Sequence, residues 1–298
     1  MRDLHQRWLR DAQGLTGMGG RLVLCPTPIG NLGDITLRAL TELREAELIL
    51  AEDTRHTAVL LRHHGISRPM LSYHDHNETL RTAEVLQMLE AGRRIVLVTD
   101  AGTPGLADPG YRLVQATVRA GVEVTALPGP SALLPALALS ALPMHAFAFH
   151  GFVPRTASAR RAAILRGLAL PLTGVWYESP RRLPATLRVV CDLGYGARPA
   201  AVARELTKVH EEVLRGSVAE LAARWTEPPK GEIVLCIGPG AAEAGAKGDM
   251  AAAVAEVERR CTAGEALSPA VAAVAAADQL TRRELYAATL AGRDRRRG

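Results

Sequence analysis

Short apolar runs alternate with loops rich in glycine and proline over the first 130 residues of the chain. Runs of strand length occupy 21–27, 48–51, 71–73, 95–99 and 122–127. Apolar residues at helical spacing follow three of these runs, at 37–43, 79–92 and 111–121. Strands that alternate with helices predict an α/β domain with a mostly parallel sheet over 21–128.

The same pattern returns in the second half of the chain. Strand-length apolar runs occupy 146–151, 174–177, 200–203 and 232–237. They predict a second α/β domain over 129–240, which begins at the proline-rich turn 128–130. The alanine- and glycine-rich stretch 241–249 is typical of a linker, and 250–298 predicts a small appendage of two or three helices with a basic tail.

The first 20 residues lack this periodicity. They mix charged and polar side chains and end in Gly19-Gly20, so we expect 1–20 to form a disordered leader. A chain that starts at Met18 is then expected to fold like the full sequence. No stretch of the chain approaches the roughly 20 apolar residues of a membrane span, and the start lacks the apolar segment of a signal peptide.

Composition and charge say less about the class of function than the pattern of strands and loops does. Hydrophobic residues make up 48% of the chain but aromatic residues only 4%, so the cores must be built from Ala, Leu and Val. The net charge of +5 favours an acidic partner, yet four arginines and one aspartate at 293–297 supply three of those charges. Total charge is therefore weak support for a nucleic-acid ligand. Local clusters of basic residues are better evidence for such a ligand.

Cysteine and histidine positions predict neither a disulfide framework nor a metal site. The four cysteines, at 25, 191, 236 and 261, are isolated from one another, which suits a reduced cytoplasm. His74 and His76 alternate across a predicted strand end, but no clear third ligand accompanies them. We therefore expect no bound metal.

The loop 100–110 gives the strongest signal for a ligand site. Asp100 follows a buried strand, and glycines at 102, 105 and 110 allow close backbone approach while two prolines stiffen the loop. In open α/β sheets, ligands bind beyond the carboxyl ends of the strands. Most loop aspartates only form turns, but this combination favours ligand binding.

Two further loops, after the first strand and at 128–132, suit a ligand without matching a nucleotide motif. The loop after the first strand contains only Gly30 and Gly33, so it lacks both the dinucleotide fingerprint and the Gly-Lys-Ser/Thr of a P-loop. The turn at 128–132 opens a helix at Ser131, whose free N–H groups suit a carboxylate. Dehydrogenase and NTPase functions lose their main support.

Polar side chains also follow the second and third strands of the first domain. We expect Arg55, His76 and Asn77 from these clusters to contact the substrate, because the ends of parallel strands meet at one edge of the sheet. The alternative is helix capping, for which Thr54 and Asn77 are suitable residues.

The second domain contains the basic residues that suit phosphate groups. Segment 155–166 has four arginines and no acidic residue, and we expect Arg160 and Arg161 to contact nucleic-acid phosphates. Arg204 follows the strand at 200–203 and is a further candidate for substrate contact. A solvated basic face is the alternative for the whole segment.

Eight motifs occur in order along the chain. They are TPIGNLGDIT, AEDTR, SYHDHNE, VTDAGTPGLADPG, PGPSA, FHGFVPR, YESPRR and ARELTK. With these motifs the chain resembles the ribosomal RNA small subunit methyltransferase I family, within the tetrapyrrole-methylase-like (class III) S-adenosylmethionine methyltransferases. The resemblance runs from about Arg21 to Leu290.

This resemblance implies two α/β domains with S-adenosylmethionine in the cleft between them, and a homodimer. The implied reaction is 2′-O-methylation of a cytidine ribose in the decoding region of 16S rRNA, either free or in the small ribosomal subunit. By the same likeness, the methyl donor would be bound by Pro28, Asp100, Gly102, Thr103, Leu106, Asp108, Ser131, Ala132, Tyr177, Ala203 and Gly231.

The residues themselves agree with this implied ligand. A pocket for S-adenosylmethionine needs a carboxylate, backbone donors and an apolar floor, which Asp100, the helix start at Ser131, and Leu106 with Tyr177 can supply. The chain has Gly-Thr-Pro at 102–104 where tetrapyrrole enzymes usually carry Gly-Asp-Pro, which favours an RNA substrate. A tetrapyrrole C-methyltransferase and a non-catalytic RNA-binding protein remain the alternatives.

The group that takes the ribose proton is the hardest to assign. Glu178 and Lys208 both lie at or just past strand ends of the second domain. Like-charge repulsion from Arg204 would lower the pKa of Lys208, so we expect Lys208 to be the base and Glu178 to orient it. The alternative is that both bind RNA or cap helices while catalysis is mostly placement.

Overall fold

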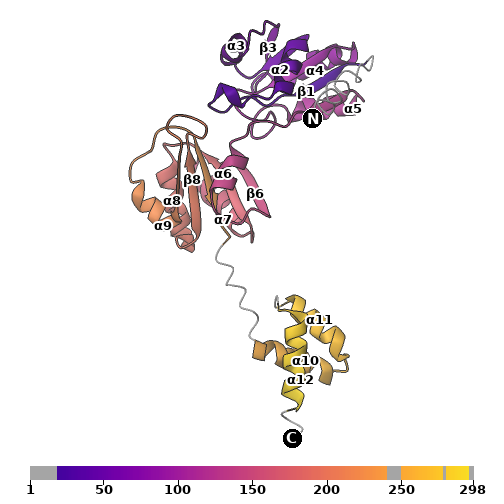
Figure 1. The fold of residues 1–298 in the computed structure, drawn as a ribbon, viewed down its shortest axis with the longest axis vertical. Coiled ribbons are helices and arrows are strands. Elements are labelled where there is room, and N and C mark those ends of the chain that lie inside the picture. The colour runs from indigo at the N-terminus through magenta and orange to yellow at the C-terminus, as the bar shows by residue number, and fades with distance from the viewer. Residues whose placement is uncertain (1–18, 240–249, 278–279, 295–298) are drawn as a thin grey trace, which may run out of the picture.

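The computed structural model describes residues 19–239, 250–277 and 280–294 (Figure 1). These residues form two α/β domains, each built on a five-stranded sheet, and a unit of three helices near the C-terminus. The expected fold class is thereby confirmed. The leader predicted over 1–20 and the linker predicted over 241–249 fall almost entirely outside the described residues.

The first sheet is entirely parallel and has the strand order β3-β2-β4-β1-β5. Its strands are β1 (Arg21–Leu24), β2 (Leu48–Ala51), β3 (Met70–Ser72), β4 (Arg94–Val98) and β5 (Glu123–Ala126). The connecting helices are η1 (Leu32–Asp34), α2 (Leu37–Glu45), α3 (Thr54–His63), α4 (Glu78–Glu90) and α5 (Tyr111–Arg119). Because all five strands run the same way, their carboxyl ends meet at one edge.

Helices cover both faces of this parallel sheet, as its apolar strands require. Val23 shares a buried cluster with Leu43 of α2, whereas its neighbour Leu22 shares another with Leu89 of α4. Successive residues of a strand point to opposite faces. A strand buried on both faces is therefore apolar throughout, which is why these strands were predictable.

The second sheet is mixed and has the order β6-β7-β10-β8-β9. Its strands are β6 (Phe147–Phe152), β7 (Thr173–Glu178), β8 (Pro199–Arg204), β9 (Glu212–Ser217) and β10 (Ile233–Ile237). Its helices are α6 (Leu133–Leu139), α7 (Ala157–Leu168), α8 (Leu183–Val190), η2 (Cys191–Tyr195) and α9 (Val218–Arg224). Only β6 and β7 pair in parallel, and β10 lies antiparallel between β7 and β8.

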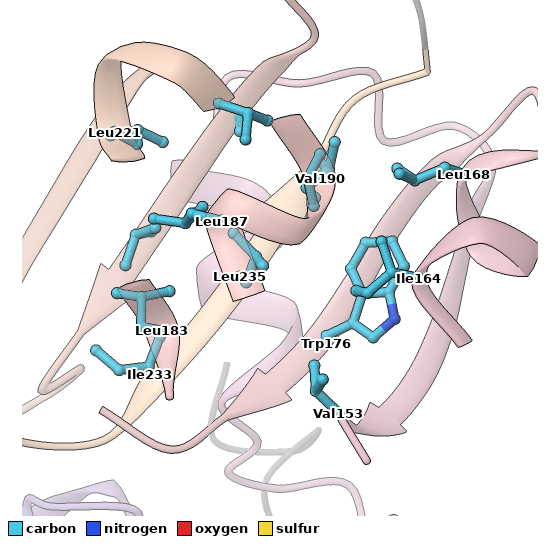
Figure 2. Packing of buried hydrophobic residues seen from close by; sticks show 14 residues of the cluster. Val153, Ile164, Leu168, Trp176, Leu183, Leu187, Val190, Leu221, Ile233 and Leu235 are labelled. Atoms are coloured by element: carbon cyan, nitrogen blue, oxygen red, sulfur yellow. The ribbon is translucent and has the colours of Figure 1, made fainter. Parts of the chain in front are cut away.

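The two faces of the second sheet carry different cores. On one face, Trp176 and Leu235 pack with Leu187 of α8 (Figure 2). On the other face, Val175 and its neighbours pack with Leu137 of α6. Strand alternation therefore assigns each residue of β7, β8 and β10 either to the α8 face or to the α6 face.

Sequence periodicity did not predict β9, α8 or α9. Strand β9 lies at an edge, and none of its residues is fully buried, so it has no continuous apolar run. Helix α8 carries Pro184 in its first turn, where proline is tolerated because that N–H has no helical partner. Proline usually marks a turn in a sequence, so Pro184 next to the turn at 179–182 gave no sign that a helix begins there.

Trp176 packs between α7 and the second sheet. Its side chain is 1% exposed and stacks on the ring of His150 at 4.6 Å between centroids. A Cβ at Gly167 or Gly174 would lie within 2.5 Å of the indole. Only glycine fits at these two positions as long as the tryptophan is present.

The C-terminal helices are α10 (Met250–Thr262), α11 (Leu267–Ala277) and α12 (Arg282–Asp294). They share a buried cluster that includes Val257, Val271 and Leu285, so they form a core of their own. The predicted helical appendage is confirmed. None of the described helices has both the length and the apolar character needed to cross a bilayer.

One part of the predicted leader belongs to the folded domain. Gly20 is buried, and a Cβ there would lie 1.7 Å from the carbonyl oxygen of Leu89 at the end of α4. The expectation that disorder extends to residue 20 is therefore wrong at Gly20. Residues 1–18 lie outside the described residues, so dispensability of the leader stays a prediction.

Candidate active site

Backbone hydrogen bonds join the loops that follow β1, β4 and β5. Thr27 and Gly102 form an isolated antiparallel bridge, in which each N–H donates to the carbonyl of the other at 2.9 Å. The Thr103 hydroxyl donates to the Pro130 carbonyl at 3.1 Å. Gly102 has a φ of +86°, which residues with a Cβ rarely adopt. The loop predicted to bind a ligand is thus held against both neighbouring loops.

A cavity of about 400 Å³ lies between these loops and the second sheet. Most residues expected at the donor site line it, namely Asp100, Gly102, Thr103, Leu106, Asp108, Ala132, Tyr177 and Ala203. They come from the loop after β4, the start of α6, and strands β7 and β8. This volume is within the range of roughly 300–1,000 Å³ that small-molecule sites occupy.

Three residues expected at the donor site lie outside the cavity lining. Pro28 borders a smaller hollow of about 50 Å³, which also touches Asp100. Ser131 is buried just before the start of α6. Gly231 has a φ of +96°, and a Cβ there would lie 2.3 Å from Cγ of Glu205. Gly231 therefore makes room for Glu205 instead of facing a ligand.

Other lining residues were not predicted. They are Ile29, Glu52, Thr99, Ala101, Phe152, Ser179, Pro180, Leu206, Glu232, Ile233 and Val234. Glu52 belongs to the same strand-end cluster as Arg55, and the strand-end rule points to both residues equally. Ile29, Leu206 and Val234 are apolar residues in or beside strands, which sequence alone cannot separate from core residues.

Carboxylates gather at one end of the cavity. The Thr99 hydroxyl donates to Glu52 at 2.9 Å, and the Asp53 N–H donates to Asp100 at 3.0 Å. Burial, and next the charge of Glu52, raises the pKa of Asp108 to about 6. This end of the cavity therefore suits a ligand that brings positive charge or hydrogen-bond donors.

Strained backbone lies beside the lining residues. Ala107 has a φ of +67° between Leu106 and Asp108, and Glu205 and Thr207 have φ values of +52° and +66° on either side of Leu206. Left-handed conformations of residues with a Cβ are unfavourable and concentrate at functional sites. Here they direct lining side chains from both domains into one cavity.

Lys208 is held as an ammonium group. Its Nζ lies 2.9 Å from Glu205 and 3.1 Å from Glu232, and its aliphatic chain packs against Gly30 of the first domain. Burial lowers the pKa of Lys208, but the hydrogen bonds with both glutamates outweigh burial, and the net pKa is raised. The expectation that Arg204 lowers this pKa is wrong.

Arg204 has its own partners on the second sheet. Its guanidinium donates to Glu212 at 2.9 Å and 3.1 Å and to the Lys230 carbonyl at 3.2 Å. The register pairs Arg204 with Glu212 across β8 and β9. This cross-strand pair neutralises the charge that was expected to act on Lys208 or on the substrate.

The Glu178 carboxylate does not face the cavity, although the residue borders it. Its side chain is fully buried and accepts hydrogen bonds from the Ser179 N–H at 2.6 Å and from the Thr186 hydroxyl of α8. Arg182 forms an ion pair with it at 2.9 Å. The expectation that Glu178 orients a base in the cleft is wrong, because its oxygens hold the turn before α8.

The substrate candidates of the first domain differ in their surroundings. Arg55 is 89% exposed and forms an ion pair with Asp53, which is the N-cap of α3 in place of Thr54. His76 is exposed. Asn77 is the N-cap residue of α4, but its amide donates to the Ser72 carbonyl and accepts from the His74 N–H and makes no capping hydrogen bond. Substrate contact by Asn77 is unsupported because its amide stabilises the turn.

The two arginines of α7 also differ. Arg161 is exposed, whereas Arg160 is half-buried and donates to the Arg155 carbonyl at 3.0 Å. Both lie on the outer surface of the second domain and neither lines the cavity. Arg161 is therefore the better candidate for a phosphate contact.

The site and the fold define a class of protein. The model of the family described as Tetrapyrrole (Corrin/Porphyrin) Methylases matches residues 21–222, which contain the whole first sheet and every strand of the second sheet except β10. The chain is a methyltransferase of this class. Among the described residues, no cluster of three or more His, Cys, Asp or Glu side chains is arranged to hold a metal.

Sequence relatives narrow the class. "Ribosomal RNA small subunit methyltransferase I" of Mycobacterium bovis is 43% identical and covers 92% of this chain and 96% of its own. The protein of that name from Mesorhizobium japonicum is 42% identical over 84% and 85% of the two chains. The one from Thermotoga maritima is 46% identical over 73% and 98%. The chain belongs to the ribosomal RNA small subunit methyltransferase I family.

Solved structures support the fold alone. A uroporphyrin-III-C-methyltransferase from Thermus thermophilus matches with a TM-score of 0.52 at 23% identity, covering 74% of this chain and 94% of that one. A diphthine synthase matches with a TM-score of 0.58 at 14% identity, covering 73% and 90%. The tetrapyrrole alternative is less supported than RNA methylation, because the sequence relatives at 42–46% identity are named for ribosomal RNA.

Proposed function

We propose that this chain transfers a methyl group from S-adenosylmethionine to the 2′-hydroxyl of a cytidine ribose in the decoding region of 16S rRNA, acting as a homodimer in the cytoplasm. The observation that carries the proposal is the cavity between the two domains, formed by a strained glycine- and proline-rich loop in a chain of this family. S-adenosylmethionine supplies an electrophilic methyl group on a positively charged sulfur.

The residues around the cavity fit this donor. Asp100 and Asp108 provide acceptors for its amino and hydroxyl groups, and Leu106 and Ala203 provide apolar contact. Gly102, with a φ of +86°, holds this loop against the loop after β1 through its two backbone hydrogen bonds with Thr27. The cavity volume of about 400 Å³ is sufficient for a ligand of this size.

Placement is the main contribution that the chain can make to the reaction. The Glu178 carboxylate is saturated by donors, and Lys208 carries its proton between two glutamates. Neither group is ready to take a proton from a ribose hydroxyl. Holding two reactants in line can supply roughly 7–11 kcal/mol, which suits a transfer whose electrophile is already activated.

Lys208 then acts as a positioning residue. Its ion pairs with Glu205 and Glu232 fix the loop that presents Leu206, and its chain contacts the first domain at Gly30. We infer that it keeps the two walls of the cavity together. Arg161 is the proposed phosphate contact on the outer surface.

Transfer to isolated small ribosomal subunits tests the proposed function. Subunits from cells that lack this enzyme are incubated with the chain and radiolabelled S-adenosylmethionine, and the label is mapped by its resistance to alkaline cleavage. We expect one 2′-O-methylated cytidine in 16S rRNA. Label on a base of the RNA, or no label at all, would contradict the proposal.

A further inference from the structure

Phe152 at the rim of the cavity has no role in the donor site described above. It is the last residue of β6, its side chain is 57% exposed, and it borders the cavity. A single exposed apolar residue is ordinary in itself. Phe152 differs from an ordinary exposed residue because an irregularity in the backbone of β6 places its side chain at the edge of the cavity.

The irregularity lies between β6 and β7. Their register pairs Phe149 with Val175 but Phe152 with Tyr177, so three steps along β6 match two along β7. Gly151, inside this interval, has a φ of +67°. One extra residue in a strand bends it and can redirect a side chain, and such bulges are frequent beside active sites.

The bulge changes the face on which Phe152 lies. In a regular strand Phe152 would share the face of His150, whose ring stacks on Trp176 in the α8-side core. Instead its ring lies 5.3 Å from that of Tyr177, at an interplanar angle of 63°, on the cavity side. Strand β6 therefore loses its regular pairing at this point, and the Phe152 ring lies at the rim of the cavity instead of in the core.

A second ring supports this arrangement from behind. The ring of Phe149 also packs edge-to-face on Tyr177, with a centroid distance of 4.9 Å and an interplanar angle of 66°. Edge-to-face contacts of this kind fix the orientation of the rings. Tyr177 also lines the cavity, so Phe152 is supported from within while more than half of its surface stays open.

Arginines occur in the two segments next to this ring, the residues after β6 and the turn at 179–182. Arg155 and Arg181 are exposed, and neither forms an ion pair with any residue within the described ranges. Arg182 donates to the Val153 carbonyl at 3.0 Å, which ties the turn at 179–182 to the residue after Phe152. An exposed aromatic ring with arginines in the adjoining segments is the combination that binds single-stranded nucleic acid, by stacking on a base and contact with phosphates.

We propose that Phe152 is the surface on which the base of the target nucleotide stacks, so that the enzyme accepts a nucleotide that has left its helical stack. This inference rests on the proposed function. A ribose inside a duplex cannot bring its 2′-hydroxyl into a cavity between two domains, whereas an extruded nucleotide can. Stacking at the rim then holds the sugar at the cavity mouth.

Three variants and one control test the proposal on small ribosomal subunits that lack the modification. Phe152→Ala removes the ring, Phe152→Leu keeps an apolar side chain, and Phe152→Trp keeps an aromatic surface. Phe147→Ala is the matched control, because Phe147 is 37% exposed at the opposite end of β6 and does not line the cavity. The readouts are kcat and KM for the subunits, and the Kd for S-adenosylhomocysteine by calorimetry.

Loss of one stacked base should lower kcat/KM of Phe152→Ala about 5- to 150-fold. Phe152→Trp should stay within about threefold of the wild type, Phe152→Leu should resemble Phe152→Ala, and the Kd for S-adenosylhomocysteine should stay within about twofold in each variant. Phe147→Ala should behave like the wild type.

Three results would overturn the stacking inference while the proposed function stands. They are a Phe152→Ala enzyme as active as the wild type, a Phe152→Leu enzyme as active as Phe152→Trp, and a loss explained by weaker binding of S-adenosylhomocysteine. If the wild type transfers no methyl group to 16S rRNA, the proposed function fails, and the inference that rests on it fails as well.

Discussion

Asp100 in the first domain and Glu178 in the second are both acidic residues at the carboxyl end of a strand. Asp100 lies two residues beyond the end of β4, and its carboxylate lines the cavity. Glu178 is the last residue of β7, and its carboxylate is buried against α8 and Arg182. One residue is placed to meet a ligand, and the other stabilises its own domain.

The two sheets explain this difference. In the parallel sheet the polar residues follow the strands, and their direction is set by loops that are bonded to one another, as at Thr27 and Gly102. In the mixed sheet Glu178 and Arg204 are still strand residues, so alternation sends them to the face opposite Tyr177 and Ala203. A strand-end position predicts a ligand contact only when the face is also considered.

The largest effect should come from Glu178→Ala. The change leaves Arg182 and two hydrogen-bond donors without their acceptor, and breaking a buried pair in this way lowers the free energy of unfolding by about 3 kcal/mol. Urea unfolding gives this value, and calorimetry at low temperature should give an unchanged Kd for S-adenosylhomocysteine. A fully stable variant with weakened binding would assign Glu178 to the ligand site after all.

Asp100→Asn should show the opposite behaviour. The amide keeps an oxygen to accept the Asp53 N–H, so stability should stay within about 0.5 kcal/mol. Loss of a charged acceptor should weaken binding of S-adenosylhomocysteine by about 2 kcal/mol, or roughly 30-fold. Asp34→Asn, in an exposed part of the loop after β1, is the control and should bind normally. Equal affinities for all three proteins would remove Asp100 from the site.

Asp108 predicts a pH dependence of stability in the ligand-free protein. Its pKa is raised from 3.8 to about 6, so the folded state binds a proton between these values that the unfolded state releases. The contribution of this carboxyl to stability therefore falls as pH rises through that window.

Comparison with Asp108→Asn isolates this carboxyl from all others. The variant should match the wild type near pH 4 and exceed its stability at pH 7 by up to about 2 kcal/mol, since one pKa unit corresponds to about 1.4 kcal/mol and solvent screening reduces the total. Urea unfolding at a series of pH values measures the difference. A difference that does not change with pH would mean that Asp108 titrates normally.

The smallest effect should come from Lys208→Met. An ammonium held between Glu205 and Glu232 is no base, so single-turnover methyl transfer at saturating subunits and S-adenosylmethionine should fall less than about tenfold. Partly exposed ion pairs contribute at most about 1 kcal/mol to stability. Lys230→Met, an exposed lysine nearby, serves as control. A fall of about 100-fold with binding preserved would restore Lys208 as the base.

Most of the fold was predictable because buried strands are apolar and loops are rich in glycine and proline. The position of β2 matches its apolar run residue for residue, at Leu48–Ala51. Edge strand β9 was not predicted because it is a strand through its antiparallel pairing with β8, across the loop 205–211, and not through its own composition. Tertiary pairing can make a strand from a segment without a local signal.

The part of the candidate site that is formed by a loop rich in glycine and proline was predictable. The residues whose role depends on the direction of their side chains were not. The glycines and prolines around Asp100 indicate a ligand loop without any structure. The partners of Lys208 and Glu178 depend on φ values at Glu205 and on the face of β7, which sequence spacing does not give. Phe152 lies at the rim because of a bulge in β6, and the pattern of hydrophobic and polar residues around it does not predict that bulge.

The packing around Trp176 has a consequence for how this family can change over time. The indole occupies the space in which a Cβ of Gly167 or Gly174 would lie, so enlarging either glycine collides with the ring, and shrinking the ring leaves a hole between two glycines. A substitution at Trp176, Gly167 or Gly174 alone is therefore expected to be destabilising. Substitutions there should arise as coupled sets, and a library that randomises these positions one at a time should return little besides the parental residues.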